Sequence, residues 1–212
     1  GHTAPGLYSV LAQRGYFPVE DLKTLRHTGS YLQGHPDMKH IPGVDMSSGS
    51  LGQGISAAVG MAIAGKLDNA DYRVYTLLGD GEIQEGQVWE AAMLAAHQKL
   101  DNLVVIVDNN NLQIDGAIDE VNSPYPIDKK FEAFNFHVIN IDGNDFDQID
   151  AAFKEAKTVK GCPTAIIAKT IKGKDVSFME NQAGWHGKAP NDEEYAVAMA
   201  DLEKVGEALC QM

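Results

Sequence analysis

The sequence has few cysteines, no long apolar run and a shortage of basic residues. Its two cysteines, Cys162 and Cys210, form no Cys-x-x-Cys pair, so we expect neither a disulfide framework nor a zinc knuckle and favour a reducing compartment. No apolar stretch approaches the roughly 18–20 residues that a membrane-spanning helix needs. The first residues show no signal-peptide pattern. These absences predict a cytoplasmic protein without a membrane segment.

Basic residues are outnumbered by acidic ones. The 212 residues include 17 Lys and Arg against 30 Asp and Glu, and the formal net charge is −13. Because nucleic acids and anionic lipid surfaces attract basic patches, this balance argues against both as partners. We find no repeat, no low-complexity tract and no clear linker, and therefore expect one domain over residues 1–212.

Strand and helix patterns alternate through most of the chain after residue 50. The expected strands are residues 73–78, 103–108, 136–141 and 164–169, and the expected helices are residues 51–66, 82–99, 145–159 and 192–211. This alternation predicts an α/β fold with a parallel sheet that is flanked by helices on both faces. Residues 29–54 are rich in Gly, Ser, His and Pro, which is typical of a long functional loop.

Polar side chains follow two of the expected strands. Asp80 comes after the strand at 73–78, and three asparagines, Asn109–Asn111, come after the strand at 103–108. If these strands are neighbours, the polar groups meet at the carboxyl ends of the strands, where parallel sheets bind ligands. One carboxylate and one amide oxygen suit Mg²⁺, which completes its shell with phosphate and water. The backbone N–H groups from Gly81 onward are placed to receive a phosphate.

Each of these motifs has a simpler interpretation when it is taken alone. A lone Asp-Gly and a cluster of asparagines are usually turns. The stretch "DNNNLQIDG" is not a calcium loop, because Leu112 and Gln113 stand where a ligand and a glycine are needed. The glycines of "GSLGQG" do not form the Gly-x-Gly-x-x-Gly fingerprint, so a nucleotide-binding module on the same sheet is not favoured.

The joint pattern is more specific than its parts. "GDG", an amphipathic helix, a buried strand and an asparagine 30 residues after Asp80 together are typical of thiamine diphosphate enzymes. The motifs "GHPD", "SSGSLGQGI", "GDGEIQEGQVWEA", "DNNNLQIDG" and "WHGKAP" also occur in the order found in transketolases. The sequence therefore resembles the diphosphate-binding half of a transketolase over nearly its whole length, as in the split, two-subunit bacterial form.

The resemblance implies a metal and cofactor site. The positions that match the family's metal ligands are Asp80, Asn110 and the backbone carbonyl of Leu112, for Mg²⁺ or for Ca²⁺ or Mn²⁺ in its place. The family's remaining contacts to thiamine diphosphate include a glycine beside the diphosphate, the loop under the aminopyrimidine and a residue lining the thiazolium. They match Gly81, the loop residues Gly49, Ser50 and Leu51, and Ile114, with Ser50 in place of a proline.

The resemblance also assigns roles to three histidines and a glutamate. His2 matches a histidine near the cofactor and substrate, His35 one that binds donor hydroxyls and moves protons, and His186 one that contacts the diphosphate and the reacting oxygen. Imidazole suits such work because its pKa lies near neutrality. Glu85 matches a glutamate that contacts the cofactor-activating glutamate of the partner, although its position alone predicts only an exposed helix residue. The other histidines match no motif, and we expect them to be surface or structural residues: His27, His40, His97 and His137.

The resemblance implies a reaction and a partner. Thiamine diphosphate chemistry moves a two-carbon ketol unit from a ketose phosphate to an aldose phosphate. In the family, the activating glutamate and the arginines for the substrate phosphate lie in a second domain, which nothing after Met212 supplies. Family members also carry a segment with one more active-site histidine before the motif that matches the start of this sequence, and the given sequence does not include that segment. We therefore expect a C-terminal subunit with the pyrimidine-binding domain, an α₂β₂ assembly, and no turnover by this chain alone.

Three alternatives stay open. 1-Deoxyxylulose-5-phosphate synthase and the α subunit of 2-oxo-acid dehydrogenases share the cofactor, although "QEGQVWEA" and "GSLGQG" favour transketolase. A non-catalytic paralogue is expected to have lost Asp80, Asn110 or the histidines, and all of these are present. The donor and acceptor sugars cannot be read from the sequence, because the discriminating pocket lies mostly on the partner.

Overall fold

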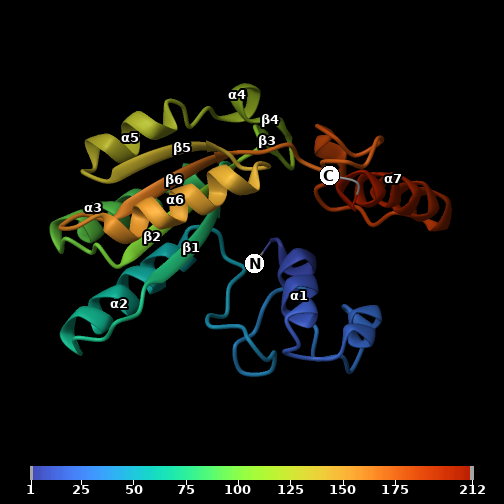
Figure 1. Ribbon diagram of the computed structural model, residues 1–212, viewed down its shortest axis with the longest axis horizontal. Coiled ribbons are helices and arrows are strands. Elements are labelled where there is room, and N and C mark those ends of the chain that lie inside the picture. The colour runs from blue at the N-terminus through green and yellow to red at the C-terminus, as the bar shows by residue number, and fades with distance from the viewer. Residues whose placement is uncertain (1, 211–212) are drawn as a thin grey trace.

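Four parallel strands form the centre of the molecule in a computed structural model that describes residues 2–210. Their order in the sheet is β1 (Val74–Gly79), β2 (Leu103–Asn109), β6 (Thr164–Lys169) and β5 (His137–Asp142) (Figure 1). Each lies within one residue of its predicted range. For β2 and β6 the prediction succeeds because each has a continuous run of apolar residues, most of which are buried by the layers above and below.

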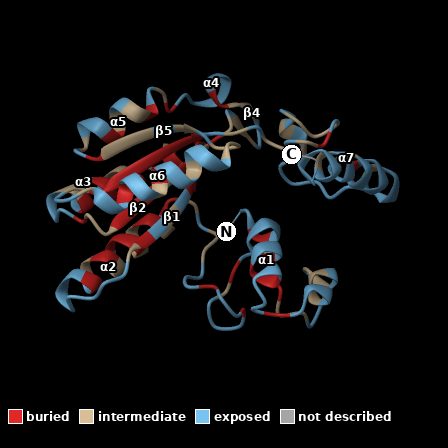
Figure 2. Ribbon diagram, viewed as in Figure 1, coloured by how far each residue is buried: buried red, intermediate tan, exposed pale blue. Residues whose placement is uncertain are grey.

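Helices cover both faces of the sheet, as predicted. The helices α2 (Gln53–Leu67), α3 (Gly86–His97) and α5 (Ile127–Ala133) share one apolar cluster with one face. On the opposite face, α6 (Phe146–Thr158) packs through Ala152 and Ala156. Figure 2 shows the buried residues concentrated in these layers. The α/β fold class is therefore confirmed.

The start of the second predicted helix differs from the expectation. Residues 82–84 form a 3₁₀ turn, η2 (Glu82–Gln84), and α3 begins only at Gly86, so Glu85 is its N-cap residue. The Glu82 carboxylate accepts hydrogen bonds from the N–H groups of Gly79, at 3.1 Å, and Gly52, at 2.9 Å. This carboxylate connects the end of β1 to the start of α2, a role that a continuous helix would not allow.

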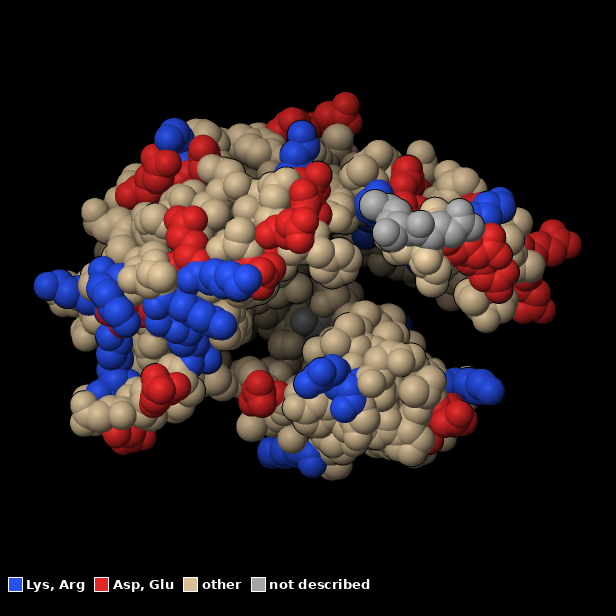
Figure 3. All heavy atoms as spheres, in the orientation of Figure 1, with Lys and Arg blue, Asp and Glu red and all other residues tan. Residues whose placement is uncertain are grey.

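The N-terminal segment has an apolar cluster of its own. Its helix α1 (Ala4–Gln13), the 3₁₀ helix η1 (Val19–Thr24) and the following loop bury Tyr8, Leu32 and Ile41. The segment lies beside α2 and β1 (Figure 1), and Figure 3 shows a hollow between it and the sheet. A cavity of about 670 Å³ lies there between the segment, α2 and β1. The expectation of one domain over residues 1–212 stays a prediction.

The C-terminal helix α7 (Asp192–Cys210) extends away from the sheet (Figure 1). Its apolar stripe is formed by Tyr195, Met199, Leu202, Val205 and Leu209. The stripe remains largely uncovered, with Tyr195 58% and Leu209 65% exposed, and Ala198 is the only buried residue of the helix in the described chain. The stripe therefore does not pack on the described part of this chain. Within residues 2–210, no helix is both long and apolar enough to cross a membrane.

Candidate functional site

The strands β1 and β2 are neighbours, which brings Asp80 beside the asparagines. The register pairs Gly79 with Asp108, and the N–H of Asp80 donates to the Asp108 carbonyl at 3.1 Å. The juxtaposition expected from the sequence is thereby confirmed. We call this part of the site, residues 79–81 and 108–112, the carboxyl edge.

The Asp80 side chain is buried and held by three N–H donors. It is 1% exposed. Its Oδ1 accepts from Gly81 N at 2.9 Å, and its Oδ2 accepts from Asn111 N at 2.6 Å and Asn109 Nδ2 at 3.1 Å. Burial raises the pKa of Asp80, and the three hydrogen bonds oppose that rise. No Lys, Arg or His among residues 2–210 forms an ion pair with it. A buried carboxylate without a countercharge fits a cation site.

Asn110 and Leu112 continue the carboxyl edge. Asn110 Nδ2 donates to Asp108 Oδ2 at 3.1 Å, and Asn110 Oδ1 accepts from Leu112 N at 3.0 Å. Thr170, which follows β6, donates to the other carboxylate oxygen of Asp108. These contacts hold the Asn110 amide in one orientation with an oxygen lone pair to spare. The described residues contain no group of three His, Cys, Asp or Glu that could hold a metal. The predicted ligands are instead one carboxylate, one amide oxygen and one backbone carbonyl, a set of oxygens that would suit Mg²⁺, and their role as ligands stays a prediction.

The loop from Gly49 to Leu51 lies close to one predicted catalytic histidine. A Cβ atom added at Gly49 would stand 2.9 Å from Cδ2 of His35, a distance that real Cβ contacts do not show. Only glycine therefore lets the ring pack against this loop. At Gly81, an added Cβ would stand 3.2 Å from the Cβ of Gln113. Both glycines thus permit close packing within the site.

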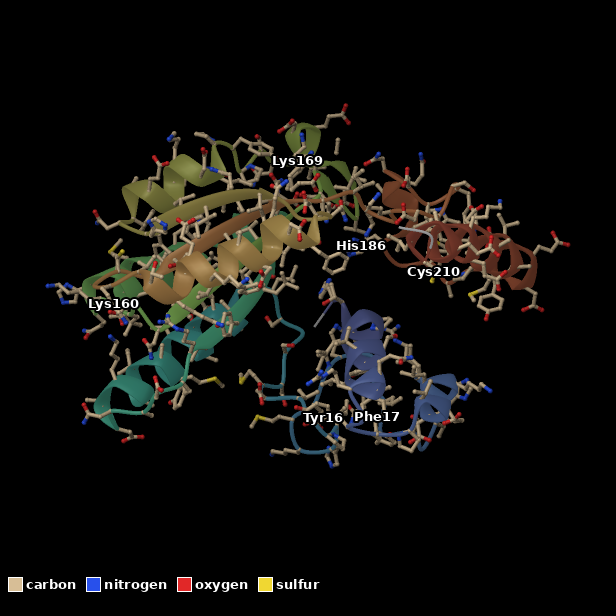
Figure 4. The ribbon with its side chains drawn as sticks, viewed as in Figure 1. Tyr16, Phe17, Lys160, Lys169, His186 and Cys210 are labelled. Carbon is tan, nitrogen blue, oxygen red and sulfur yellow. The ribbon has the colours of Figure 1, made fainter. Side chains whose placement is uncertain are left out.

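The three predicted histidines come together from distant parts of the chain, and we call His2, His35 and His186 the histidine cluster. The ring centroids of His2 and His35 are 5.7 Å apart, and those of His2 and His186 are 6.1 Å apart. His186 follows the 3₁₀ helix η3 (Ala183–Trp185), which contacts the short strand β4 (Gly116–Ala117). Figure 4 shows His186 between the sheet, α7 and the N-terminal segment. Within residues 2–210, none of the three rings makes a side-chain hydrogen bond.

The electrostatic surroundings of His186 identify a residue that the sequence analysis missed. Desolvation lowers the pKa of His186, and repulsion from Lys172 and His2 lowers it further. Lys172 therefore places a positive charge near the histidine cluster. The available signal was its position three residues beyond the end of the expected strand at 164–169, on the ligand-binding side of a parallel sheet.

Three further predicted residues are exposed. Glu85 lies next to Gly52 and has no ion-pair partner within residues 2–210. Ile114 is 64% exposed, in the turn that joins the short strand β3 (Leu112–Gln113) to β4. Ser50 is exposed in its loop. Their predicted contacts with a cofactor or partner stay predictions.

Two of the histidines without a motif take part in surface pairs. His40 Nδ1 lies 2.5 Å from Asp37 Oδ2, and His137 Nε2 lies 2.6 Å from Glu155 Oε1. His27 and His97 are exposed. These positions agree with the expectation that the four residues are surface or structural.

Sequence comparison identifies the family. Residues 1–204 match the family described as "Transketolase, thiamine diphosphate binding domain". The chain belongs to this family. It is 47% identical over 206 residues to the 6-deoxy-6-sulfo-D-fructose transketolase subunit SqwG of Clostridium sp. (strain MSTE9), a match that covers 97% of this chain and 75% of that protein. It is 42% identical over 203 residues to one of the subunits of the apulose-4-phosphate transketolase of Actinobacillus succinogenes, covering 96% of this chain and 73% of that protein.

Solved transketolase structures share the fold. The crystal structure of transketolase from Campylobacter jejuni superposes with a TM-score of 0.85 at 37% identity and covers 92% of this chain. The chain spans 32% of that structure and 30% of the Homo sapiens transketolase, to which it is 47% identical over 192 residues. The predicted membership of the transketolase family and the predicted thiamine diphosphate-binding fold are therefore confirmed.

Proposed function

We propose that this chain is the diphosphate-binding subunit of a two-chain transketolase, which transfers a two-carbon ketol unit from a ketose phosphate to an aldose phosphate. The observation that carries the proposal is the meeting of Asp80 with the asparagines at the carboxyl edge, in a chain that matches the family over almost its full length. Two relatives named as transketolase subunits, of which this chain spans about three quarters, support the division into two chains.

The residues of this chain have separate tasks in the proposed reaction. When bound, thiamine diphosphate supplies the nucleophilic carbon and the electron sink for breaking and making the carbon–carbon bond. Asp80, Asn110 and the Leu112 carbonyl would hold Mg²⁺, or Ca²⁺ or Mn²⁺, against the diphosphate. The hydrogen bonds that already fix Asp80 and Asn110 reduce the reorganisation that binding requires. The loop at 49–51 would support the aminopyrimidine.

The histidine cluster would bind sugar hydroxyls and move protons. Because the pKa of His186 lies below its usual value, its ring is neutral at pH 7 and presents one N–H donor and one acceptor nitrogen. A neutral imidazole orients an oxygen without adding a charge. His35 and His2 would share this work because their rings lie in the same cluster.

The partner would be a C-terminal transketolase subunit with the pyrimidine-binding domain and the activating glutamate, in an α₂β₂ assembly. The exposed Glu85 carboxylate and the exposed Ile114 support this arrangement, since both lie near the carboxyl edge and neither is covered within the described chain. The sugar preference would follow from the partner.

The proposal is tested by reconstitution. Purified chain, a C-terminal transketolase subunit from the same organism, and the mixture of the two are assayed for ketol transfer between sugar phosphates with thiamine diphosphate and Mg²⁺. We expect turnover by the mixture and none by either chain alone. Turnover by this chain alone would refute the need for a partner. If cofactor and Mg²⁺ shift the thermal unfolding of neither the chain nor the mixture, the cofactor assignment is wrong.

A further inference from the structure

We propose that Asn109 and Tyr125 are positioning residues that set the orientation of the Asp80 carboxylate for a divalent cation. Neither residue is among the predicted ligands. The inference rests on the proposed function, because it concerns what holds the predicted metal ligand in place. The argument depends on a closed ring of hydrogen bonds around Asp80.

Asn109 is the first member of the ring. It ends β2 and is 8% exposed. Its Nδ2 donates to Asp80 Oδ2 at 3.1 Å and to the Tyr125 hydroxyl at 2.6 Å, and a third, longer contact reaches Asn111 Oδ1 at 3.4 Å. A carboxylate only accepts hydrogen bonds. The amide therefore supports Asp80 only with its nitrogen facing the carboxylate, and the reversed amide would place two acceptor oxygens against each other.

Tyr125 supports the same orientation of the amide. Its hydroxyl accepts from Asn109 Nδ2 and donates its own proton to Asn111 Oδ1. The backbone N–H of Asn111 in turn donates to Asp80 Oδ2 at 2.6 Å, which closes the ring. Because the hydroxyl proton is committed to Asn111, the Tyr125 oxygen faces Asn109 as an acceptor and favours the amide nitrogen on that side.

The ring leaves the two Asp80 oxygens unequal. Oδ2 receives two donors, from Asn109 and Asn111, whereas among residues 2–210 Oδ1 receives only the N–H of Gly81, at 2.9 Å. Oδ1 therefore keeps a lone pair that is available to coordinate a cation. All the donors are neutral, so they hold the carboxylate without competing for the cation as a Lys or Arg would. Outer partners that orient a metal ligand are typically worth about 10–100-fold in metal affinity.

The test measures metal affinity apart from fold stability. In the complex with the partner subunit, Mg²⁺ is titrated at saturating thiamine diphosphate, and the half-saturating Mg²⁺ concentration is read by calorimetry. Tyr125→Phe removes one oxygen and should raise that concentration roughly 10-fold. Asn109→Leu should raise it roughly 10–100-fold. Tyr72→Phe is the matched control, because the Tyr72 hydroxyl bonds the Met61 carbonyl away from the carboxyl edge, and it should leave the value unchanged.

Thermal unfolding of the same variants without cofactor separates positioning from structural support. The inference is overturned if Tyr125→Phe lowers the unfolding temperature but leaves the half-saturating Mg²⁺ concentration unchanged. A weakened Mg²⁺ response in a variant that unfolds at the wild-type temperature supports it. If Asn109→Leu does not fold, Tyr125→Phe decides alone. If the wild-type complex shows no Mg²⁺-dependent cofactor binding, the proposed function fails and this inference fails with it.

Discussion

The carboxyl edge and the histidine cluster are held in place in different ways. At the carboxyl edge, Asp80 is buried and receives three hydrogen bonds from residues at the ends of two paired strands. In the histidine cluster, His2, His35 and His186 are exposed, come from three separate segments and have no side-chain hydrogen bond within residues 2–210. The comparison indicates a preorganised end that suits a metal and a less constrained end that suits groups which bind hydroxyls and exchange protons.

The largest expected effect comes from removing the carboxylate at the carboxyl edge. Asp80→Ala eliminates the only charged group among the predicted ligands, so Mg²⁺-dependent binding of thiamine diphosphate should weaken by more than about 100-fold, beyond the range of outer-shell changes. Calorimetry with and without Mg²⁺ measures it. Asp71→Ala makes the same charge change at an exposed position and should have no effect. Equal cofactor affinity in wild type and Asp80→Ala would show that the carboxyl edge is not the metal site.

An intermediate effect is expected from displacing one histidine without touching the carboxyl edge. In Gly49→Ala the new Cβ would stand 2.9 Å from the His35 ring, so the ring must move. A shift of about 1 Å can cost up to about 100-fold in rate. We expect kcat of the reconstituted enzyme to fall roughly 10–100-fold, with the half-saturating Mg²⁺ concentration unchanged. Gly60→Ala is the control, since an added Cβ there meets nothing within 4 Å. A parallel loss of Mg²⁺ affinity would show that the two parts of the site are not independent.

The smallest expected effect is a change in the titration of His186. Lys172→Gln removes a repelling charge, so the pKa of His186 should rise toward its usual 6.5. Because the folded pKa is lowered, the unfolded chain binds more protons between the two values. The contribution of His186 to the stability of the folded chain is therefore complete above about pH 6.5, and it is lost as the pH falls through the pKa of His186 in the folded state. NMR of the imidazole protons measures the shift. Lys174→Gln, whose charge is not among the causes of the shift, should leave it unchanged; the same result for Lys172→Gln would remove Lys172 from the site.

The carboxyl edge was predictable from the sequence because its signals are local. Strand ends, marked by the change from apolar residues to Asp80 and to the asparagines, can be read from short windows, and the intervening helix has the length of a crossover. The histidine cluster was predicted only through the resemblance to transketolases. Tyr125 and Lys172 were missed, because no local pattern connects either residue with Asp80 or His186 across the intervening chain.

The sequence by itself determined the family, the four strands of the main sheet with four of the helices, and the residue types available to a metal and a diphosphate, because periodicity and motif spacing are properties of short segments. The tertiary structure alone decided that β1 pairs with β2 in the register of Gly79 with Asp108, and that Tyr125 completes the hydrogen bonds around Asp80. It also left the stripe of α7 exposed. The physical reason is that such contacts depend on how all the layers pack together, which no single segment specifies.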